Sequence, residues 1–425
     1  MHVLVIPSEE FVPERNHAIG IFQYHQAKIM MEHGYKVGAL SITQAFSIPM
    51  LLKSLLYKLS LRKTGNVTDS YSFTKVISVL YKKLYAQHKY LQENNITGIP
   101  VFRIEGFYYK SPSDYSSMYG WVKAGMVAFD NYIAKYGMPD MVHAHNAMYA
   151  GALAQKINEK YKVRYVITEH STLFARDMVT DPKLLNVLAE AYKTANGVFA
   201  VSKPFCNLLS NKFPNISFTY FPNVIDPYLE KQPFITGEIK KDEFVFLNIA
   251  ELHPKKNHQL LLEAFAQLKK NAKYSNVKLW IAGSGVEHDN IINTIAKLNL
   301  QEDVKMLGLL NRDQILQVIK DCNTVVLSSN FETFGVVLIE GMLFGKPVIA
   351  TKCGGPESFV NDSCGILVDK QNKNQLSDAM AKLVNNIDSY NPEQIRSYTL
   401  QEFGENKFFA DIEKIYSRYL NNIAK

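Results

Sequence analysis

Short apolar runs alternate with longer segments whose apolar residues recur at helical spacing, and this alternation occurs twice along the chain. Such a pattern is typical of a parallel sheet with helices on both faces. The first series of expected strands comprises residues 3–6, 37–40, 101–104, 141–145, 165–168 and 198–201. The second comprises residues 244–249, 278–282, 304–307, 324–327 and 348–350. Each series predicts one doubly wound α/β domain.

A stretch rich in turn-forming residues separates the two series. Three prolines and a glycine between residues 222 and 237 stand among charged residues, which indicates a linker. We therefore expect an N-terminal domain over residues 1–225 and a C-terminal domain over residues 226–404, each of a size that one core can organise. Residues 405–425 repeat apolar side chains at helical spacing and predict a final helix that packs back on the N-terminal domain.

Composition supports a globular enzyme-sized protein. Of the 425 residues, 47% are hydrophobic and 20% are charged, which is enough apolar surface for two cores. The four cysteines form no C-x-x-C pair, so we expect neither a disulfide nor a zinc site. No apolar run reaches the ~18 residues of a membrane span, and the first residues lack the features of a secretory signal. We therefore expect a cytoplasmic protein.

The positive charge is concentrated in one segment. Residues 36–91 contain nine Lys or Arg residues and only one acidic residue, Asp69, whereas the rest of the chain is close to neutral. Residues 49–91 also place leucines on one helical face and lysines elsewhere, as in a helix on an anionic membrane surface. Helices that pack on their own domain with solvated lysines explain the pattern equally well. If these residues bind an anionic membrane, we expect the protein to act at the inner face of that membrane. Nucleic acid is not an expected partner, because the aromatic residues follow helical spacing.

The candidate chemistry gathers at one strand end. Residues 328–347 read as a strand end, a loop, a helix and a Gly-Lys-Pro stop. The helix is apolar nearly all round and carries one charge, Glu340, which needs a partner such as ribose hydroxyls. Glu332 precedes it by eight residues, a helical span of about 12 Å that fits a sugar, a diphosphate and a ribose. Backbone amides near Phe334 and Gly335 can bind phosphate oxygens.

The segment ETFGVVLIEGM, which contains both glutamates, is similar to the E-x7-E signature of the GT4 retaining glycosyltransferases. Further matching pieces follow in the family's order: PNVID at 222–226, KKN at 255–257, IAGSG at 281–285, Gly308 and GGPE at 354–357. The resemblance covers nearly the whole chain. It implies an α/β protein of the GT-B fold, with two Rossmann-like doubly wound parallel-sheet domains facing each other across a cleft. The N-terminal domain would bind the acceptor and the C-terminal domain the nucleotide sugar.

The resemblance also implies roles for residues of the donor site. Glu340 would hold the ribose, Glu332 would contact the donor sugar, and Lys256 would neutralise the departing diphosphate. The other implied donor contacts are Gly20, Glu251, Lys255, Gly283, Thr333, Phe334, Gly335 and Val336. Structural alternatives are a buried Glu340 paired with a base, a solvated Lys256 and a plain turn at Gly283.

One residue departs from the family pattern. Most members carry an arginine five positions before the lysine, and this chain has Glu251 there. Either Lys255 or another base supplies the second phosphate cation, or the donor contacts differ.

Two strand ends carry polar residues in the first half of the chain. His143 and His145 share one face of their strand and resemble the family's H-x-H stretch, whose second histidine touches donor sugar and acceptor. Glu169 and His170 end the next strand. The implied acceptor contacts are His143, Glu169 and His170, and the implied catalytic residues are His145, Lys256 and Glu332. The alternatives are a satisfied core histidine at 143 or at 145 and a structural hydrogen-bonded pair at 169–170.

The implied activity is transfer of a hexosyl group from a nucleotide-diphosphate sugar to a saccharide or lipid-linked glycan with retention of configuration, in cell-envelope polysaccharide or glycolipid synthesis. Front-face attack, in which the departing diphosphate accepts the acceptor's proton, fits these roles. A covalent intermediate would need two carboxylates about 5 Å apart on one glycosidic bond. No D-x-D motif or acid cluster indicates a metal, and no cofactor is expected beside the nucleotide sugar.

Other functions remain as alternatives. A nucleotide-sugar epimerase or hydrolase would share the two-domain architecture, and a non-catalytic nucleotide-sugar-binding protein would account for Glu251. An NAD-dependent oxidoreductase is disfavoured, because no glycine fingerprint follows the first strand.

Overall fold

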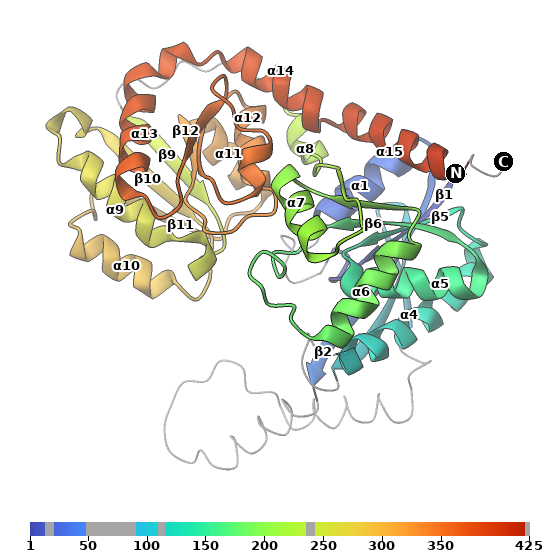
Figure 1. Cartoon of the computed structure of the whole chain (residues 1–425). Helices are drawn as coiled ribbons and strands as arrows, with labels where there is room; N and C mark the ends of the chain where they lie inside the picture. Colours follow the sequence, from blue (N-terminus) through green and yellow to red (C-terminus); the bar gives the residue numbers. More distant parts are fainter. Residues whose placement is uncertain (13–20, 48–90, 109–114, 235–242, 421–425) are drawn as a thin grey trace, which may run out of the picture. The chain divides into compact units, whose positions relative to one another are not determined.

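Two compact units make up the described part of the chain. The computed structural model describes residues 1–12, 21–47, 91–108, 115–234 and 243–420. Unit 1 comprises Met1–Phe199, Ser210–Thr219 and Asp411–Lys425, and unit 2 comprises Ala200–Leu209 and Tyr220–Ala410. Figure 1 shows that helices surround a central sheet in each unit.

Unit 1 is built on an eight-stranded sheet in the order β3-β4-β2-β1-β5-β6-β7-β8. β1 pairs parallel with β2 and β5, and β5 pairs parallel with β6, whereas β3 is antiparallel to β4. The run HVLVIP of β1 is buried along its whole length, as expected for a central strand covered on both faces. The strands are β1 (His2–Pro7), β2 (Lys36–Ser47), β3 (Gln92–Ile96), β4 (Ile99–Tyr108), β5 (Met141–His145), β6 (Arg164–Glu169), β7 (Gly197–Ala200) and β8 (Thr219–Tyr220).

Helices cover both faces of this sheet. α4, α5 and α6 lie beside one another on one face, and α1 and α15 lie on the other (Figure 1). The buried Tyr416 of α15 directs its hydroxyl to Met30 Sδ of α1 at 3.7 Å. The helices of unit 1 are α1 (Ile21–Glu32), α4 (Tyr115–Tyr136), α5 (Ala152–Tyr161) and α6 (Pro182–Thr194), with a π-helical turn, η1 (Ala147–Gly151), before α5, and two further helices, α7 (Lys203–Lys212) and α15 (Glu405–Leu420), have residues in both units.

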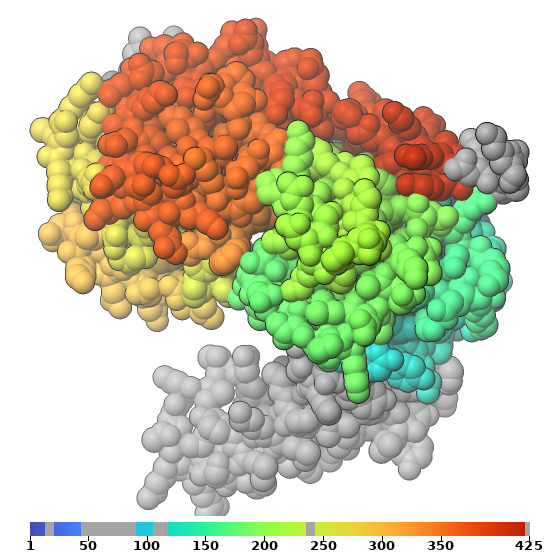
Figure 2. All heavy atoms as spheres, in the orientation of Figure 1, coloured from blue at the N-terminus to red at the C-terminus, as the bar shows by residue number. Residues whose placement is uncertain are grey.

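Unit 2 holds a six-stranded sheet in the order β11-β10-β9-β12-β13-β14, in which each neighbouring pair is parallel. Its strands are β9 (Phe244–Ile249), β10 (Val277–Ala282), β11 (Val304–Gly308), β12 (Thr324–Leu327), β13 (Val348–Thr351) and β14 (Gly365–Val368). Its helices are α8 (Pro227–Glu230), α9 (His258–Lys269), α10 (His288–Lys297), α11 (Arg312–Asp321), α12 (Val336–Leu343), α13 (Lys373–Asn386) and α14 (Pro392–Phe403). Its 3₁₀ turns are η2 (Pro254–Lys256), η3 (Ala272–Tyr274), η4 (Gly355–Ser358) and η5 (Ile387–Ser389). In the space-filling view, orange and red segments that follow β12 form most of the visible face of unit 2 (Figure 2).

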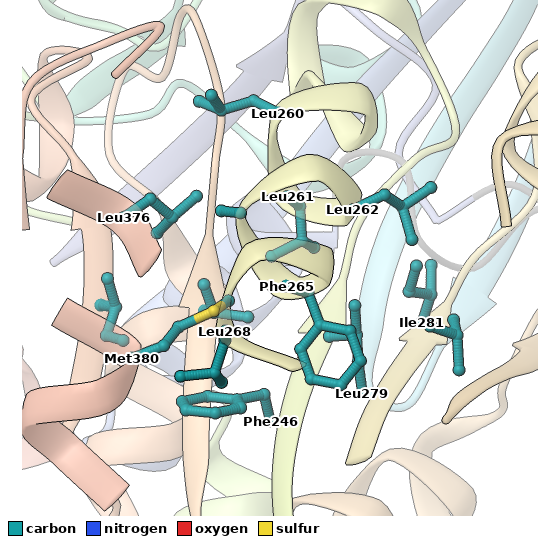
Figure 3. Packing of buried hydrophobic residues seen from close by; sticks show 14 of the residues in the cluster. Phe246, Leu260, Leu261, Leu262, Phe265, Leu268, Leu279, Ile281, Leu376 and Met380 are labelled. Carbon is teal, nitrogen blue, oxygen red and sulfur yellow. The ribbon is translucent and has the colours of Figure 1, made fainter. Parts of the chain in front are cut away.

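The core of unit 2 lies between the sheet and the pair α9 and α13. Leu261 and Phe265 of α9 pack over Phe246 of β9 and Leu279 of β10, and Met380 of α13 joins them (Figure 3). Burying each such side chain stabilises the fold by roughly 1.5–3 kcal/mol. This core holds β9 and its neighbours in a fixed order, which determines what meets at their ends.

The doubly wound α/β class expected from the sequence is confirmed, and every strand expected from an apolar run is present. β3, β8 and β14 were not among the expected strands, and β8 has only two residues. β3 has the sequence QENNI and lies at the sheet edge with mostly exposed residues, so it carries no apolar run. β14 has only four residues, one of them glycine, which is too short for a periodic signal.

Both sheets contain a point where the strand order reverses. In unit 2, β9 lies between β10 and β12, and in unit 1, β1 lies between β2 and β5. Ligands of open α/β sheets bind outside the carboxyl ends of the strands at such a point. A ligand site is therefore expected at the loops after β9 and β12 in unit 2 and at those after β1 and β5 in unit 1.

Candidate functional site

An ion pair joins the loops that follow β9 and β12. Lys256 Nζ lies 2.5 Å from Glu332 Oε1, and the Ser329 hydroxyl donates a hydrogen bond of 2.8 Å to the same oxygen. The lysine and glutamate side chains are only 17% and 10% exposed. Neither Lys256 nor Glu332 is therefore a freely solvated surface charge.

Lys256 is positioned by its backbone. The Ser328 hydroxyl donates to the carbonyl oxygens of Lys256 and Asn257, at 3.0 and 3.1 Å. The Asn330 amide donates to the Lys255 carbonyl at 2.8 Å. Asn257, with φ 51°, begins α9 and accepts a hydrogen bond from the Leu260 amide on its side chain. The loop that carries Lys256 is thus held to the loop that carries Glu332.

Glu332 is fixed through both of its backbone polar groups. Its amide donates to the Cys353 carbonyl at 3.0 Å, and its own carbonyl accepts from the Gly355 amide at 2.9 Å. A Cβ on Gly355 would lie 2.2 Å from the Phe334 carbonyl oxygen, so only glycine allows this close approach. The room beside Gly355 is therefore filled by the loop of Glu332.

The start of α12 presents unpaired amides. The helix begins at Val336, after Gly335 with φ 101°, and no side chain caps it within the described residues. The Val336 and Val337 amides donate to no backbone or side-chain acceptor there. The Phe334 ring turns into the core, 5.1 Å from the Phe359 ring centroid, so its backbone alone faces this end of α12. Such a helix start favours an anion.

Glu340 lies in the second turn of α12 and has no hydrogen bond or ion pair among the described residues. The residue retains some contact with solvent. Its pKa is nevertheless raised to about 8, chiefly because burial disfavours the charged form and further because of the Asp226 carboxylate, while Arg312 acts in the opposite direction. Because α12 begins only at Val336, the span of about 12 Å expected for a fully helical segment from Glu332 to Glu340 does not apply as such.

Arg312 does not neutralise Glu340, because it forms an ion pair with Asp226. Asp226 also caps α8 by accepting from the Tyr228 amide at 2.8 Å, and the Arg312 guanidinium lies 4.7 Å from the Tyr228 ring centroid. Neither Asp226 nor Arg312 was a predicted site residue. Two features of the sequence could have indicated them: Asp226 is the last residue of the PNVID motif, and Arg312 follows soon after the strand β11.

Glu251, the departure from the family pattern, is paired with its neighbour one turn on. Lys255 Nζ lies 2.9 Å from Glu251 Oε2. Burial raises the pKa of Glu251, but the hydrogen bond and charge of Lys255 outweigh it, and the net shift is downward. Lys255 is thus balanced by Glu251.

Gly283 has a structural reason to be glycine. It follows β10 with φ +140°, and a Cβ there would lie 1.9 Å from the Ala250 carbonyl oxygen. Its amide donates to the Gly308 carbonyl at 2.7 Å. Gly283 therefore lets the loops after β9, β10 and β11 meet, whether or not a ligand is bound.

We expect Gly283→Ala to lower the free energy of unfolding by about 2–4 kcal/mol, because the methyl group clashes with rigid backbone. Gly308→Ala is the matched control, since φ is +69° and nothing lies within 4 Å of an added Cβ. The control should lose only about 1 kcal/mol through left-handed strain. Urea denaturation measures both, and equal losses would show that the approach to Ala250 is not required.

In unit 1, His145 ends β5 and meets two aromatic neighbours. Its Nδ1 lies 3.0 Å from His170 Nε2, and the Phe22 ring centroid lies 4.4 Å from that of His170. Burial lowers the pKa of His145 well below its usual range, with further lowering from His143 and His170. The ring is therefore neutral at pH 7, and one of the paired nitrogens donates while the other accepts.

His143 is satisfied inside unit 1. Its two ring nitrogens lie 2.8 Å from the Tyr416 hydroxyl and 2.8 Å from the Thr168 hydroxyl. Burial lowers its pKa to about 3, so the ring is neutral. Contact with an acceptor would require His143 to give up one of these bonds.

Glu169 points into unit 1. One carboxyl oxygen accepts from the Ala147 amide at 2.5 Å and from the Tyr192 hydroxyl at 2.6 Å, and the residue is fully buried. Burial raises its pKa to about 7, against the effect of these hydrogen bonds. We assign Glu169 a positioning role for the turn after His145, and its contact with an acceptor stays a prediction.

Ser8, which follows β1, was missed by the sequence analysis. Its hydroxyl lies 2.8 Å from the His145 carbonyl and 2.5 Å from the Met148 carbonyl, and accepts from the Ala150 amide at 3.3 Å. The turn that it holds contains Tyr149 with φ 73° and ψ −75°, an uncommon backbone conformation. A serine after a buried strand is too common a pattern to reveal such a role.

Two predicted features fall outside the described residues. They are Gly20 and the basic segment 49–91, apart from Leu91 at its end. Within the described ranges, none of the helices combines the length and the hydropathy that a membrane span requires. No group of three or more His, Cys, Asp or Glu that could hold a metal occurs among those same residues.

Two family models match successive parts of the chain. Residues 87–228 match the model described as Glycosyltransferase Family 4, and residues 231–399 match the model described as Glycosyl transferases group 1. The first range contains His145, and the second contains Lys256, Glu332 and Glu340.

The chain is also similar to curated proteins. It is 26% identical over 291 residues to the N-acetyl-alpha-D-glucosaminyl L-malate synthase of Bacillus anthracis, covering 65% of this chain and 74% of that relative. It is 37% identical over 138 residues to the N-acetylgalactosamine-N,N'-diacetylbacillosaminyl-diphospho-undecaprenol 4-alpha-N-acetylgalactosaminyltransferase of Campylobacter jejuni, covering 32% of this chain and 36% of that relative. The matches thus span between 36% and 74% of the length of these relatives.

A solved structure extends the likeness over nearly the whole chain. The HepE protein of Anabaena in complex with UDP superposes with a TM-score of 0.68 at 18% identity, covering 98% of this chain and 100% of that chain. At this identity the likeness shows the fold, which is that of the GT-B type.

Proposed function

This chain belongs to the GT4 glycosyltransferases, and from that premise we propose that it transfers a sugar from a nucleoside diphosphate sugar to a saccharide or lipid-linked glycan with retention of configuration. Glycosyl transfer follows from the family. The donor class, the stereochemical course and the acceptor class are the proposal.

The observation that carries the donor class is the arrangement around α12. The helix start offers unpaired amides to an anion, Lys256 is held by Glu332 four residues before that start, and Glu340 follows in the second turn without a hydrogen-bond partner among the described residues. A nucleoside diphosphate matches this order, because its phosphates are anionic and its ribose carries hydroxyls that donate to a carboxylate.

The proposed reaction is front-face attack. The bond between the sugar and the diphosphate breaks, the acceptor oxygen bonds to the same face of the sugar, and the leaving diphosphate oxygen takes the acceptor's proton. Lys256 and the amides of α12 stabilise the negative charge that develops on the leaving group. Glu332 accepts hydrogen bonds from sugar hydroxyls. In unit 1, His145 is the residue that we propose contacts the reacting sugar or the acceptor.

A thermal-shift screen against UDP-, GDP- and ADP-sugars, followed by product analysis, tests this function. Selective binding of one donor at 100 times its Kd should raise the apparent stability by about 2.7 kcal/mol. A glycosylated product formed only with acceptor supports transfer, with oligosaccharides and polyprenyl-linked saccharides as trial acceptors. An epimerised donor, or free sugar formed at the same rate without acceptor, would instead favour an epimerase or a hydrolase. Donor binding without any product would favour a binding protein.

We expect full transfer activity in EDTA, unchanged within about twofold. Lys256, once a diphosphate takes the place of Glu332 beside it, and the α12 amides provide the positive potential that a divalent ion would otherwise supply to the diphosphate. Initial rates before and after chelation, with magnesium and manganese added back, measure this. A strict requirement for either ion would contradict the assignment of leaving-group stabilisation to Lys256.

For the acceptor, we propose a saccharide or lipid-linked glycan of the cell envelope, used at the inner face of the membrane. The chain is related to cell-envelope glycosyltransferases, and the Campylobacter jejuni relative has a diphospho-undecaprenol substrate in its name. The basic composition of residues 49–91 is compatible with an anionic surface.

A further inference from the structure

The catalytic lysine of the proposed function is paired with a carboxylate of the protein itself. Lys256 Nζ lies 2.5 Å from Glu332 Oε1, in a pair whose side chains are 17% and 10% exposed. A carboxylate and a diphosphate are both anions, so they compete for this one ammonium group. Any ligand that brings a diphosphate to the start of α12 must break or share the pair.

Glu332 is held in place by hydrogen bonds and so stays close to Lys256. Its amide and carbonyl are both hydrogen-bonded, to Cys353 and Gly355, and Ser329 holds its carboxylate at 2.8 Å. Only three residues separate it from Val336, where the unpaired amides of α12 begin. The carboxylate therefore stays near the place proposed for the diphosphate.

The next lysine does not replace Lys256. Lys255 Nζ lies 2.9 Å from Glu251 Oε2, where most members of the family carry an arginine instead of Glu251. The four side chains on these two loops thus form two ion pairs with no net charge. A diphosphate that takes Lys256 leaves Glu332 with the Ser329 hydroxyl alone and with an anion beside it.

We propose that the Glu332–Lys256 pair makes the site discriminate between a nucleotide sugar and a nucleoside diphosphate, an inference that rests on the proposed function. When a nucleotide sugar binds, its sugar hydroxyls donate to Glu332 in place of Lys256, so the carboxylate remains satisfied. After transfer, the nucleoside diphosphate offers no hydroxyl at that point. Glu332 then repels the product and recaptures Lys256, which favours product release.

Glu332→Gln tests this inference, because it removes the competing charge and keeps the shape. UDP, GDP and ADP, each with its glucose derivative, are titrated by calorimetry, and the nucleotide that binds wild type best is used for comparison. We expect Glu332→Gln to bind the nucleoside diphosphate about tenfold more tightly or better, and to bind the nucleotide sugar no more tightly than wild type. Its preference for the sugar form should shrink or reverse, and product inhibition of any residual transfer should strengthen.

Asp369→Asn is the matched control. Asp369 also follows a strand and pairs with a lysine, Lys352, at 2.8 Å, but it is an exposed acid after β14. The Asp369→Asn variant should bind the nucleoside diphosphate and the nucleotide sugar as tightly as wild type does. This comparison separates a local effect of Glu332 from the effect of losing one negative charge anywhere on the protein. A gain in affinity cannot result from misfolding, so the expected outcome is also evidence that the variant is folded.

The outcomes distinguish the two claims. The inference fails if the ratio of the dissociation constants for nucleoside diphosphate and nucleotide sugar agrees within about threefold among wild type, Glu332→Gln and Asp369→Asn. The Glu332–Lys256 pair then does not discriminate between these ligands, whereas binding of the nucleotide sugar by wild type leaves the proposed function intact. If wild type binds no nucleotide sugar at all, the proposed function and this inference both fall.

Discussion

Replacing Lys256 by methionine is expected to lower kcat for sugar transfer about 10²- to 10³-fold, the loss typical of removing one group that stabilises developing negative charge. Methionine keeps most of the aliphatic stem, so the packing around η2 should survive. KM for the donor should rise much less than kcat falls, because the charge on the leaving oxygen is greatest in the transition state. Steady-state kinetics over a range of donor concentrations measure both constants.

Lys278→Met is the control for this prediction. Lys278 pairs with Asp303 at 2.9 Å, and it lies near the amino end of β10, away from the carboxyl ends that carry the site. Both variants lose one charge and one ion pair, yet only Lys256→Met should lose activity. A kcat for Lys256→Met within about threefold of wild type would remove Lys256 from the proposed mechanism.

At pH 9, where the Glu340 carboxyl with its pKa of about 8 is ionised, replacing Glu340 by glutamine is expected to weaken donor binding about 10²-fold or more and to abolish donor-induced thermal stabilisation. Two hydrogen bonds from ribose hydroxyls to a charged acceptor contribute roughly 1.5–3 kcal/mol each, and the amide is a weaker acceptor that also presents donors to hydroxyls. Calorimetric titration with the donor identified by the screen measures the change. Unchanged affinity would contradict the ribose assignment.

The same variant should become more stable than wild type at high pH. The folded pKa of Glu340, about 8, is above the ordinary value of 4.5. Between these values the folded chain holds a proton that the unfolded chain has released, so the free energy of unfolding falls as pH rises through this range. Above pH 8 glutamine should exceed wild type by about 2 kcal/mol, less than the full shift implies because solvent reaches the residue.

Near pH 5 the ligand-free wild type and Glu340→Gln should differ in stability by less than about 1 kcal/mol, because the folded wild type is protonated at Glu340 and only its unfolded chain, with the ordinary pKa of 4.5, has released the proton. Urea titrations at pH 5 and pH 9 give the comparison. A variant that is less stable than wild type at both values would show that the Glu340 carboxylate has a protein partner, and that its role is structural.

Much of the fold follows from local sequence. Buried strands such as β5 and β9 consist mostly of apolar residues, and their observed bounds agree with those expected from the sequence. The end of α12 also follows locally, because Gly345 adopts φ 69° just after the helix and Pro347 cannot continue it. β3 could not be predicted in this way, because an edge strand exposed to solvent needs no apolar run.

The sequence by itself determined the two α/β series, the strand ends that carry polar residues, and the motif that joins Glu332 to Glu340. Only the tertiary structure decided which side chains meet. Lys256 and Glu332 are 76 residues apart and pair because β9 and β12 are neighbours, and Arg312 turns to Asp226, 86 residues away, instead of to Glu340. Apolar periodicity records whether a residue faces the core, whereas the partner of a polar group depends on strand order, which the whole core selects.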